Sequence, residues 1–564
     1  LNCSNMAPVT SGNANHGLTE SISAVDPTAV RHENQQSIQV ASDRLTYTPE
    51  FIHARYEYQN THVERTRGAD GKEELIAKPF KQEFEFRTSR SVPRTGLMLV
   101  GLGGNNGTTI SATVLANRHQ IQWHNKEGLQ TPNYYGSLVR ASTVRLGSDA
   151  QSGKDVWVPF SQMLPMVHPN DLVLGGWDIS SAPLDKAMER AKVLDYDLQR
   201  QLAPHMAEIK PLPSVYYPDF IASNQEDRAD NVIPGHDKQA HVEQLRQDIR
   251  TFKQKHGLEQ VIVVWTANTE RYSDIIPGVN DTADNLLRAV QSSHEEVSPS
   301  TIFAVACILE NTPYINGAPQ NTFVPGAIEL AERHKAFIGG DDLKTGQTKV
   351  KSVLAEYLVN AGIKPLSIAS YNHLGNNDGY NLSSQRQFRS KEISKSSVVD
   401  DCCEANSLLY SPAPTGKDAS GNAPAKGERP DHCIVIKYMP AVGDQKVAMD
   451  DYTSELCMGG RNRLYVTNLC EDSLLASPLL LDLAILAELM TRISYRDPGA
   501  DESSWQSMYS ILSLLSYSLK APLVKPRTDV VNSLNRQRAA VTNFLRACLA
   551  LAPESDMLLE TRLW

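Results

Sequence analysis

The sequence lacks the cysteine patterns that build disulfide frameworks or zinc sites. Its eight cysteines are spread over 564 residues, none belongs to a CxxC pair, and no His and Cys set has zinc-ligand spacing. Several lie in apolar, strand-like runs such as AVACILE and HCIVIKY, which indicates buried thiols in a reducing compartment. We therefore expect free thiols, no metal site and a cytoplasmic location.

Excess basic charge and long apolar runs are also missing. The chain has 55 basic and 65 acidic residues, and a net charge of -10 argues against a nucleic-acid backbone as the main partner. The most apolar late segment, PLLLDLAILAELM, contains Asp482 and Glu488 and is expected to be too short to span a bilayer. The polar N-terminus shows no signal-peptide pattern. We expect a water-soluble protein with neither a nucleic-acid nor a membrane partner.

The chain is too long for a single core, and a prior of roughly 150 residues per domain predicts two to four structural units. Residues 1–40, rich in Ser, Asn, Thr and Ala, are expected to form a mobile polar tail. The charged residues 61–75 predict a surface turn, and the alternating KQEFEFRT at 81–88 predicts a half-exposed strand. Residues 411–430, rich in Pro, Gly, Ala and Ser, predict a surface loop.

Short apolar runs separated by helical stretches predict a parallel sheet. Runs of this length are typical of strands that crossover helices bury on both faces. The predicted strands are 97–103, 171–178, 261–266, 301–309 and 365–371.

Later apolar runs at 432–439, 446–456 and 462–469 follow one another through short links. This pattern is typical of an antiparallel sheet in a second layer or domain. The helices expected after them are at about 473–493, 505–518 and 530–551. The predicted fold class is therefore an α/β parallel-sheet domain plus an α+β domain with a largely antiparallel sheet.

A glycine-rich turn between a strand and a helix is the strongest local motif. In TGLMLVGLGGNNGTTISATVLANR, an apolar strand leads into Gly101, Gly103, Gly104 and Gly107, and a helical segment follows. Glycine lets the backbone approach a pyrophosphate, whose charge meets the free N–H groups at the helix start. The spacing departs from GxGxxG, because Asn106 stands where the third glycine would fall. The strand and helix on either side favour dinucleotide binding over a structural tight turn.

An acidic residue is expected at the end of the second cofactor strand. None occurs about 20 residues after the glycine turn, and the next candidate is Asp178, at the end of DLVLGGWD. A carboxylate there would reach the adenosine ribose hydroxyls and favour NAD over NADP. The alternative is that Asp178 only caps the helix that follows. Residues 119–170 would then be an insertion with elements of its own.

Three segments rich in uncharged polar residues follow predicted strands, namely WTANTERY (265–272), NGAPQNTFVPG (316–326) and SYNHLGNNDG (370–379). Ligands bind beyond the carboxyl ends of strands in open α/β sheets. Three such segments at one sheet edge therefore predict a polyhydroxylated substrate beside the cofactor. The alternative is turn formation alone, since Asn and Gly are good turn formers.

Lysines beside small or polar residues are the other candidate chemistry, in GGDDLKTGQTKVK, QFRSKEISK, VGDQK and SLKAPLVKP. A buried ammonium can hold a phosphate, stabilise an enolate or alkoxide, and transfer protons when its pKa is lowered. Most lysines are solvated surface charges, so the sequence alone does not select the active ones. His373 and His432 are expected to be core or supporting donors rather than nucleophiles.

These segments resemble a known family. GLGGNNGTT, WTANTERY, NGAPQNTFVPG, GDDLKTGQTK and SYNHLGNNDGYNL, with FRSKEISKSSVVDD, CIVIKYM and CEDSLLASPL, closely resemble the eukaryotic inositol-1-phosphate synthases, over about residues 45–564. Two positions depart from the family pattern. Ala318 stands where Ser is common, which removes one hydroxyl beside the cofactor, and Leu102 stands where Trp is common, which changes packing.

The resemblance implies an isomerase that converts glucose 6-phosphate to 1L-myo-inositol 1-phosphate, the first step of inositol biosynthesis. The implied reaction is redox-neutral: NAD-dependent oxidation at C5, enolisation, intramolecular aldol closure onto C1, and re-reduction. Two alternatives stay open, an ordinary NAD-dependent sugar-phosphate dehydrogenase and a catalytically inactive NAD-binding regulatory protein. The family's lysines and aspartates are all present, which speaks against the second.

The resemblance also implies the site residues. The catalytic set is Lys391, Lys520, Lys446, Lys395, Asp342, Asn372 and Asp472. Within it, Lys391 and Lys520 are assigned to proton transfer at the C5 oxygen, and Lys395 and Lys446 to the phosphate or the C1 carbonyl oxygen. The substrate-phosphate set is Thr345, Gly346, Gln347, Asn376 and Asn377. The NAD set is Gly101, Leu102, Gly103, Gly104, Asn105, Asn106, Asp178, Gln225, Arg228, Thr266, Ala267, Gly317, Ala318, Asp378 and Asp444.

The domain organisation implied by the family is a Rossmann-type domain over 85–348 and a catalytic and tetramerisation domain over 349–475. Residues 41–84 and the C-terminal helices over 476–564 would pack back on the first domain. Family members form tetramers, so we expect a homotetramer with the second domain's sheet at the interface. The antiparallel pattern over 432–469 agrees with that expectation.

Overall fold

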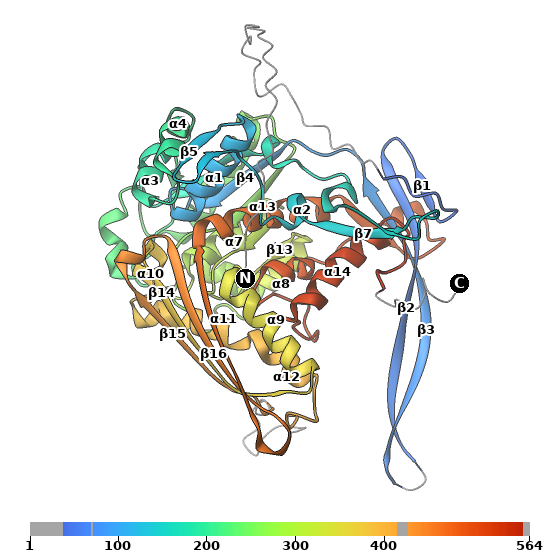
Figure 1. Cartoon of the computed structure of the whole chain (residues 1–564). Helices are drawn as coiled ribbons and strands as arrows, with labels where there is room; N and C mark the ends of the chain where they lie inside the picture. Colours follow the sequence, from blue (N-terminus) through green and yellow to red (C-terminus); the bar gives the residue numbers. More distant parts are fainter. Residues whose placement is uncertain (1–37, 69–70, 414–426, 556–564) are drawn as a thin grey trace, which may run out of the picture.

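The computed structural model describes residues 38–68, 71–413 and 427–555 of the chain (Figure 1). Most of the predicted tail over 1–40 and of the predicted loop over 411–430 lies outside these residues, so both stay predictions. The described residues form three larger sheets with helices around them. Each sheet brings together a different part of the chain.

A six-stranded parallel sheet carries the first part of the chain. Its order is β10-β9-β4-β11-β12-β13, so β4, the strand before the glycine turn, lies between β9 and β11. The strands are β4 (Thr95–Val100), β9 (Val173–Asp178), β10 (Leu212–Pro213), β11 (Gln260–Trp265), β12 (Tyr314–Asn316) and β13 (Ile338–Gly339). Neighbouring strands are all parallel, which confirms the strands predicted at 97–103, 171–178 and 261–266.

Alternating side chains of β4 point into two separate cores. Leu97 and Leu99 pack in one cluster, and Met98 and Val100 pack in the other, on the opposite face of the sheet. The first face is covered by α1 (Asn105–Arg118), α3 (Leu184–Ala191), α4 (Tyr196–Ala207) and α13 (Asp472–Thr491). The second is covered by α5 (Lys238–Lys255), α6 (Ala283–Gln291), α7 (Pro299–Leu309) and α8 (Pro325–His334). A parallel sheet with helices on both faces is the Rossmann-type arrangement that the sequence predicts.

The predicted strand at 301–309 is wrong, because TIFAVACIL forms helix α7. Ser298 Oγ accepts the Thr301 N–H at its N-terminus, and Pro299 occupies the first turn. Every residue from Pro299 to Ile308 is buried, so apolar character alone could not distinguish a buried helix from a buried strand. The strand of this region is the three-residue β12, which follows the helix.

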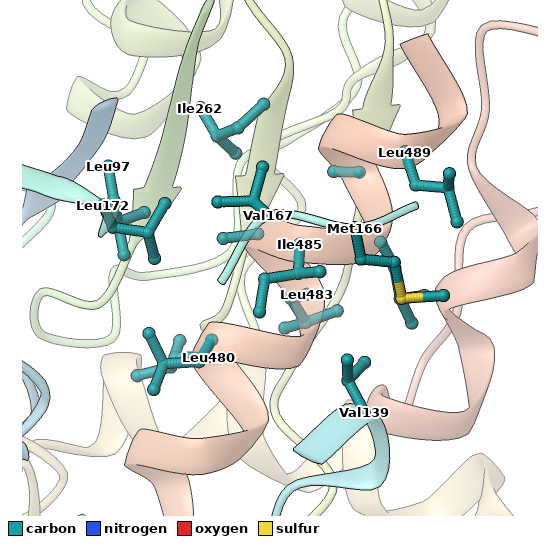
Figure 2. Close-up of a cluster of buried hydrophobic side chains, with 14 of the residues drawn as sticks. Leu97, Val139, Met166, Val167, Leu172, Ile262, Leu480, Leu483, Ile485 and Leu489 are labelled. Carbon is teal, nitrogen blue, oxygen red and sulfur yellow. The ribbon is translucent and has the colours of Figure 1, made fainter. Parts of the chain in front are cut away.

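Helix α13 is apolar on all sides and crosses the core. With 20 residues and a hydropathy of 1.8, it is long and apolar enough to cross a membrane, so the predicted shortness of this segment is wrong. However, 83% of that stretch is buried inside the protein. Figure 2 shows its Leu480, Leu483, Ile485 and Leu489 beside Leu97, Val139, Met166, Val167, Leu172 and Ile262. A helix with apolar side chains all round packs as a core helix when other elements cover it.

Residues 119–170 carry elements of their own, as expected. They form the hairpins β5 (Trp123–Asn125) with β6 (Gly128–Gln130) and β7 (Thr143–Ser148) with β8 (Asp155–Pro159), and the short helix α2 (Leu138–Ala141). Asp482 of α13 accepts from Ser137 Oγ at 2.5 Å and from the Leu138 N–H at 2.6 Å. The one acid in the middle of α13 therefore anchors the insertion through the start of α2.

A four-stranded sheet forms the second part of the chain, in the order β15-β14-β16-β17. Its strands are β14 (Lys364–Leu374), β15 (Asp431–Tyr438), β16 (Gln445–Glu455) and β17 (Arg461–Glu471). β16 pairs antiparallel with β14 and β17, whereas β14 and β15 are parallel, so the sheet is largely antiparallel as predicted. One face packs against α9 (Gly346–Asn360) and α11 (Gln385–Ser396), and α12 (Asp400–Glu404) packs against α9.

Two strand assignments in this sheet are corrected. The run at 365–371 belongs here and not to the first sheet, and Tyr371 is 43% exposed rather than buried on both faces. The run at 432–439 pairs with β14 and not with 446–456, because β14 lies between them. Strand order is set by long-range contacts, which links of a few residues do not reveal.

A five-stranded antiparallel sheet joins the two ends of the described chain. Its order is β1 (Leu45–Tyr47), β2 (Phe51–Arg67), β3 (Glu73–Ser89), β18 (Ile493–Arg496) and β19 (Gln506–Ser507). The β2–β3 hairpin extends away from the body (Figure 1) and contains the strand predicted at 81–88. The turn predicted over 61–75 is confirmed only between Arg67 and Glu73, because the residues on either side belong to β2 and β3 and their charges pair across the strands, as Arg65 does with Glu73 at 2.6 Å.

The last part of the described chain differs from its predicted helices. The long helix expected at 473–493 is confirmed as α13, and the helix expected at 530–551 is α14 (Leu534–Ala547). The helix expected near 505–518 is wrong, because these residues form β19 and a short 3-10 helix, Ser513–Ser518.

The seven cysteines in the described residues are free thiols. Cys307, in AVACILE, is buried as predicted but lies in a helix. Cys433, in HCIVIKY, is exposed, so its predicted burial is wrong. It lies on β15, an edge strand of the four-stranded sheet, where alternate side chains face away from the core.

Candidate active site

A cavity lies where the carboxyl ends of the parallel strands meet the four-stranded sheet. Its volume of about 450 Å³ falls in the usual range for ligand sites. Residues directly after β4, β9, β11 and β12 line one side, and residues after β14 line the other. The predicted site residues on its wall are Gly101, Gly104, Asn105, Asn106, Asp178, Arg228, Thr266, Ala267, Gly317, Ala318, Asp342, Thr345, Asn376, Asn377, Asp378, Lys391, Asp444, Lys446, Asp472 and Lys520.

The three polar segments meet at this cavity, although not at one sheet edge as predicted. Two of them, 265–272 and 316–326, extend from β11 and β12 of the parallel sheet, whereas 370–379 extends from β14 of the other sheet. Asn377 Nδ2 donates to Asn268 Oδ1 at 3.0 Å across the junction. The site therefore forms between two sheets.

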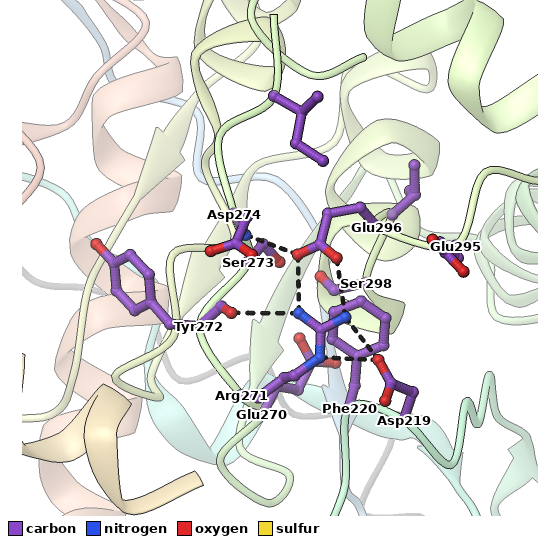
Figure 3. Close-up of polar contacts among 12 residues, drawn as sticks. Asp219, Phe220, Glu270, Arg271, Tyr272, Ser273, Asp274, Glu295, Glu296 and Ser298 are labelled. Carbon is purple, nitrogen blue, oxygen red and sulfur yellow. Dashed lines mark hydrogen bonds and ion pairs between the residues drawn. The ribbon is translucent and has the colours of Figure 1, made fainter. Parts of the chain in front are cut away.

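An ion-pair network around the buried Arg271 holds the segment after β11 from behind. Arg271 donates to Glu296 Oε1 at 2.8 Å and to Asp219 Oδ2 at 2.6 Å (Figure 3). Glu270 accepts from the N–H and Oγ of Ser300 at the start of α7, and burial raises the pKa of Glu270 to about 7. The charged end of WTANTERY anchors the segment, while its first residues line the cavity.

The glycine turn is shaped for close approach of a ligand to the backbone. Gly101 has φ +91°, and a Cβ there would lie 2.7 Å from the backbone of Ala267. A Cβ on Gly107 would lie 2.3 Å from the Leu102 carbonyl oxygen, so Gly107 replaces the missing third glycine. Gly104 is the N-cap of α1 and has no side chain to satisfy the first N–H groups of the helix. These N–H groups can therefore meet a pyrophosphate.

Asp178 braces this turn. Its Oδ2 accepts from the Gly103 N–H at 2.8 Å and its Oδ1 from the Ser180 N–H at 2.9 Å. The cap interpretation is wrong, because α3 begins at Leu184 with Pro183 as its N-cap. Asp178 lines the cavity and is 3% exposed, and burial raises its pKa. The contact with ribose stays a prediction.

Asp342 holds two lysines at once. Its Oδ1 accepts from Lys391 Nζ at 3.0 Å and from Lys520 Nζ at 3.1 Å, and its Oδ2 accepts from Ser394 Oγ at 2.6 Å. All these side chains are buried. Although burial would raise it, the two ammonium groups hold the pKa of Asp342 well below its usual range. One carboxylate compensates only one positive charge in a buried site, so the two lysines cannot both keep the ordinary pKa of a lysine.

The two lysines on Asp342 differ in their protonation. Burial lowers the pKa of Lys520 to about 7, and the charges of Lys391 and Lys446 act in the same direction. Burial also opposes the charge of Lys391, but Asp342 and Asp378 raise its pKa above the ordinary value. An amine near its neutral point and a permanent ammonium thus lie on one carboxylate. This arrangement suits proton transfer near neutral pH with stabilisation of a developing negative charge.

Lys446 and Asp472 form a second pair, with Nζ 2.9 Å from Oδ1. Asp472 is the first residue of α13, where the helix N-terminus favours a negative charge. Burial would raise the pKa of Asp472, but Lys446 lowers it below the usual value. Asn376 Nδ2 lies 3.4 Å from Asp472 Oδ2 and connects the pair to the segment after β14.

Lys395 lies behind the cavity wall rather than on it. Its Nζ donates to Gln347 Oε1 at 3.2 Å and to Asn372 Oδ1 at 3.3 Å, and all three side chains are at most 3% exposed. Burial, followed by the charges of four neighbouring lysines, lowers the pKa of Lys395 well below its usual value. The three predicted residues are therefore brought together, but in a layer beneath the cavity surface.

The start of α9 supplies the clearest anion site. Thr345 is its N-cap, makes no side-chain cap hydrogen bond and lines the cavity. The first N–H groups of the helix can therefore bind an anion. Gly346 has φ +40°, and a Cβ there would lie 3.1 Å from Cys470 Sγ, so a larger residue would disturb this turn.

The other two predicted phosphate residues have structural partners. Asn376 Oδ1 accepts from the Gly379 N–H and caps α10 (Asn377–Asn381). Asn377 Nδ2 donates to Gln225 Oε1 at 2.9 Å, and Gln225 also accepts from Arg228. Gln225 is fully buried, so its predicted place in the cofactor set is behind the wall.

The remaining cofactor candidates divide between wall and support. Leu102 is fully buried in the first core cluster, and Gly103 binds Asp178 through its N–H, so neither lines the cavity. Asp378 Oδ1 accepts from Thr269 Oγ1 at 3.1 Å. Asp444 Oδ1 accepts from Asn105 Nδ2 at 2.9 Å. Both acids therefore tie the second part of the chain to the cofactor side.

Sequence reasoning missed several residues on the cavity wall, namely Arg190, Lys192, Ser214, Tyr216, Asn268, Tyr380 and Tyr438. Arg190 and Lys192 lie at the end of α3, the first helix after the second cofactor strand, and that position could have indicated them. Asn268 belongs to the predicted polar segment 265–272, from which only Thr266 and Ala267 were assigned to the cofactor. No local signal marks Tyr216 or Tyr438.

The residues present fit a dinucleotide. The glycine cradle, the uncapped start of α1 and the acid at the end of β9 are the features that hold a pyrophosphate and an adenosine ribose. Among the described residues, no group of three or more His, Cys, Asp or Glu side chains is placed to hold a metal ion. The fold and the buried lysine–aspartate groups together define a nicotinamide-nucleotide enzyme for a small anionic substrate.

Comparison with known proteins identifies the family. A family model described as myo-inositol-1-phosphate synthase, an NAD-binding family, matches residues 95–546. The chain is 56% identical over 528 residues to inositol-3-phosphate synthase of Dictyostelium discoideum, covering 94% of this chain and 99% of that protein. It is 56% identical over 524 residues to human inositol-3-phosphate synthase 1, covering 93% and 90%.

A solved structure agrees with the sequence matches. The crystal structure of inositol-3-phosphate synthase from Caenorhabditis elegans superposes with a TM-score of 0.87 at 50% identity, covering 93% of this chain and 98% of that chain. The chain therefore belongs to the myo-inositol-1-phosphate synthase family, and its cofactor is NAD.

Proposed function

We propose that the lysine end of this cavity carries out the family's reaction, the conversion of glucose 6-phosphate to 1L-myo-inositol 1-phosphate. The chain is an isomerase of the inositol-3-phosphate synthase type, and identities of 56% over more than nine-tenths of the chain do not favour a simple dehydrogenase or an inactive regulator. The observation that carries the proposal is the single carboxylate of Asp342 shared by Lys391 and Lys520 inside the cofactor cavity.

At the glycine end of the cavity, backbone groups and one acidic side chain would hold NAD. Gly101, Gly104 and the first N–H groups of α1 would hold the pyrophosphate, and Asp178 the adenosine ribose. When bound, NAD supplies a hydride acceptor at C5 and later returns the hydride. The hydrogen bond from Asn105 to Asp444 joins the two parts of the chain beside the NAD site.

At the C5 oxygen, neutral Lys520 would accept the hydroxyl proton. Lys391, which stays an ammonium, would stabilise the negative charge on the oxygen, and the same pair would return the proton in the reverse direction. Asp342 keeps both amines in place through one oxygen. Lys446, held by Asp472, would stabilise charge at the C1 carbonyl oxygen when the ring closes.

The substrate has to stay bound through every step. The start of α9 at Thr345 and Gly346, with Lys395 behind it, would hold the phosphate while the carbon chain reacts. Anchoring the phosphate keeps C1 and C6 close enough to join, because a tethered reaction needs no second encounter.

The test is to incubate the chain with glucose 6-phosphate and a catalytic amount of NAD. A phosphorylated cyclitol should form in amounts far above the NAD added, with no growth of reduced-nicotinamide absorbance, since the hydride returns to the same substrate. Reduced nicotinamide that grows in step with product would instead support the dehydrogenase alternative.

Assembly into a homotetramer through the four-stranded sheet is part of the proposal. The face of this sheet turned away from α9 exposes Tyr371, Tyr465 and Leu469 by 43%, 67% and 58%, which supports burial against another copy. Light scattering should give the mass of four chains, and Tyr465→Glu with Leu469→Glu should reduce it. Tyr196→Glu, at an 82% exposed site on α4, is the matched control. An unchanged mass in the double variant would exclude this face.

A further inference from the structure

A buried carboxylate lies one side chain away from the active-site lysines. Asp450 on β16 is 2% exposed and does not line the cavity. Its Oδ1 accepts from Gln347 Nε2 at 2.5 Å, and its Oδ2 accepts from Tyr452 Oη at 2.9 Å. Both of its oxygens are therefore engaged from within the protein, by one residue of the site and one residue of the core.

The contact with Asp450 decides which end of the Gln347 amide faces Lys395. An ionised carboxylate only accepts hydrogen bonds, so the end of the amide beside Asp450 has to be the NH₂ group. The other end, Oε1, then faces Lys395 and accepts from its Nζ at 3.2 Å. Without Asp450 the amide could turn, and its NH₂ group would then face Lys395 Nζ in place of the acceptor Oε1.

Lys395 depends on this acceptor more than the other active-site lysines depend on theirs. Lys391 and Lys520 bind Asp342, and Lys446 binds Asp472, whereas the described partners of Lys395 are the neutral oxygens of Gln347 and Asn372. A carboxylate attracts an amine over a range of positions, but an amide holds it only in the direction of its oxygen. The place of Lys395 therefore follows from the orientation of two amides.

We propose that Asp450 is a positioning residue for substrate binding, which orients the Gln347 amide so that Lys395 Nζ is held directly behind the proposed phosphate site at the start of α9. The inference rests on the proposed function, because it takes the start of α9 and Lys395 as the phosphate site. It adds a residue outside the cavity that touches neither substrate nor cofactor. In this proposal Asp450 acts on Lys395 through Gln347, and its second partner, Tyr452, holds the carboxylate from the core side.

The experiment measures steady-state kinetics of cyclitol phosphate formation by the full chain with Asp450→Val. The KM for glucose 6-phosphate should rise about tenfold or more, while kcat should change by less than about threefold. The reason is that contacts to the phosphate group stabilise the bound substrate and the transition state equally. Inorganic phosphate should inhibit more weakly by a similar factor, because it binds the proposed phosphate site without any contact from the sugar. The dissociation constant of NAD should not change.

Three variants keep the result interpretable. Asp450→Asn keeps an acceptor for Gln347 and should restore the KM to within about threefold of the parent. Tyr452→Phe removes the other partner of Asp450 and should leave the KM near the parent value. In a Gln347→Leu background, Asp450→Val should add almost nothing to the KM, since the two act in one path. Asp450→Ala replaces the valine variant if that one does not fold.

The outcomes separate the two claims. If the parent chain forms no cyclitol phosphate, the proposed function fails. If the parent is active and a folded Asp450→Val or Asp450→Ala keeps the parent KM and phosphate inhibition, Asp450 does not position Lys395. A higher KM together with equally impaired kcat and NAD affinity would also overturn the inference, since it indicates general destabilisation. Additive effects with Gln347→Leu would overturn it too, since they show that the two residues act independently.

Discussion

The two ends of the cavity handle charge in different ways. The glycine end consists of backbone N–H groups, close-packed glycines and a single braced acid, Asp178. The lysine end consists of four lysine side chains from three separate segments, α11, β16 and the residues after Ser518, buried near Asp342 and Asp472 with fewer acids than amines. The first end is a preformed binding site for a dinucleotide. The second carries excess positive charge, which can bind a phosphate and stabilise a developing alkoxide.

This difference predicts how each end fails. When one contact of the glycine end is removed, NAD affinity should fall only in part, because the other backbone contacts remain. A buried cluster of amines loses its chemistry when one charge is removed, because the protonation of the others changes with it. Substitutions at the lysine end should therefore act on turnover, and those at the glycine end on NAD binding.

The largest effect is expected from the two lysines on Asp342. Lys391→Ala and Lys520→Ala should each lower turnover by about a hundredfold or more, because each removes either the proton acceptor or the charge that stabilises the oxygen. NAD affinity and assembly should stay intact. Lys126→Ala, whose side chain is 88% exposed, is the matched control. A well-folded variant that keeps near-parent turnover removes that lysine from the mechanism.

The pH dependence of turnover sharpens the same comparison. The pKa of Lys520 is lowered to about 7, so its neutral, proton-accepting form grows as pH rises through 7. From this titration kcat should rise about tenfold between pH 6 and pH 8 and level off above. In Lys391→Met, Lys520 would be the one lysine left on Asp342, without the repelling charge of Lys391. The pH midpoint of kcat should therefore move to a higher pH. A pH-independent kcat, or an unmoved midpoint in an active variant, would separate Lys520 from this role.

At the glycine end, Asp178→Ala should lower NAD affinity by about tenfold or more, which corresponds to about 1.4 kcal/mol. The substitution leaves the Gly103 and Ser180 N–H groups without their acceptor and removes the predicted ribose contact. Turnover at saturating NAD should fall much less. Titration calorimetry measures the affinity, with Asp185→Ala on α3 as the control. Unchanged affinity in a folded variant would reduce Asp178 to a brace for the turn.

The same contrast explains what the sequence could predict. The glycine end is local: β4, the turn and α1 are consecutive, and the strand that ends in Asp178 has its own apolar pattern. The lysine end is not local, because Lys520 and Asp342 are 178 positions apart and meet only after folding. Its residues came from the family resemblance and not from spacing. That one carboxylate serves two lysines is visible only in the structure.

The fold shows the same limit. Runs such as β4, β9 and β11 were predicted because a parallel strand buried on both faces leaves an apolar run. TIFAVACIL has that composition too, but Ser298 and Pro299 begin a helix there, which a closer look for caps could have found. The pairing of β15 with β14 joins residues far apart along the chain, so the short links between later strands misled the prediction. The pairing of β2 with β3 is local, but their charged residues lie on exposed strands, so charge alone suggested too wide a turn.

The smallest effect is expected where the two ends meet, at Ala318. Its carbonyl oxygen accepts the Asp342 N–H at 3.0 Å, while its side chain lines the cavity at the cofactor end. Ala318→Ser would restore the hydroxyl that the family pattern has there. One additional neutral hydrogen bond contributes about 0.5–1.5 kcal/mol, so NAD should bind about two- to tenfold more tightly. The backbone contact that positions Asp342 does not involve the side chain, so kcat and its pH midpoint should stay as in the parent. Calorimetry and a pH series on Ala318→Ser, with Ala318→Gly as the control for side-chain packing, measure both. A change in the pH midpoint without a change in NAD affinity would mean that this position belongs to the lysine end, and that the division between the two ends lies elsewhere.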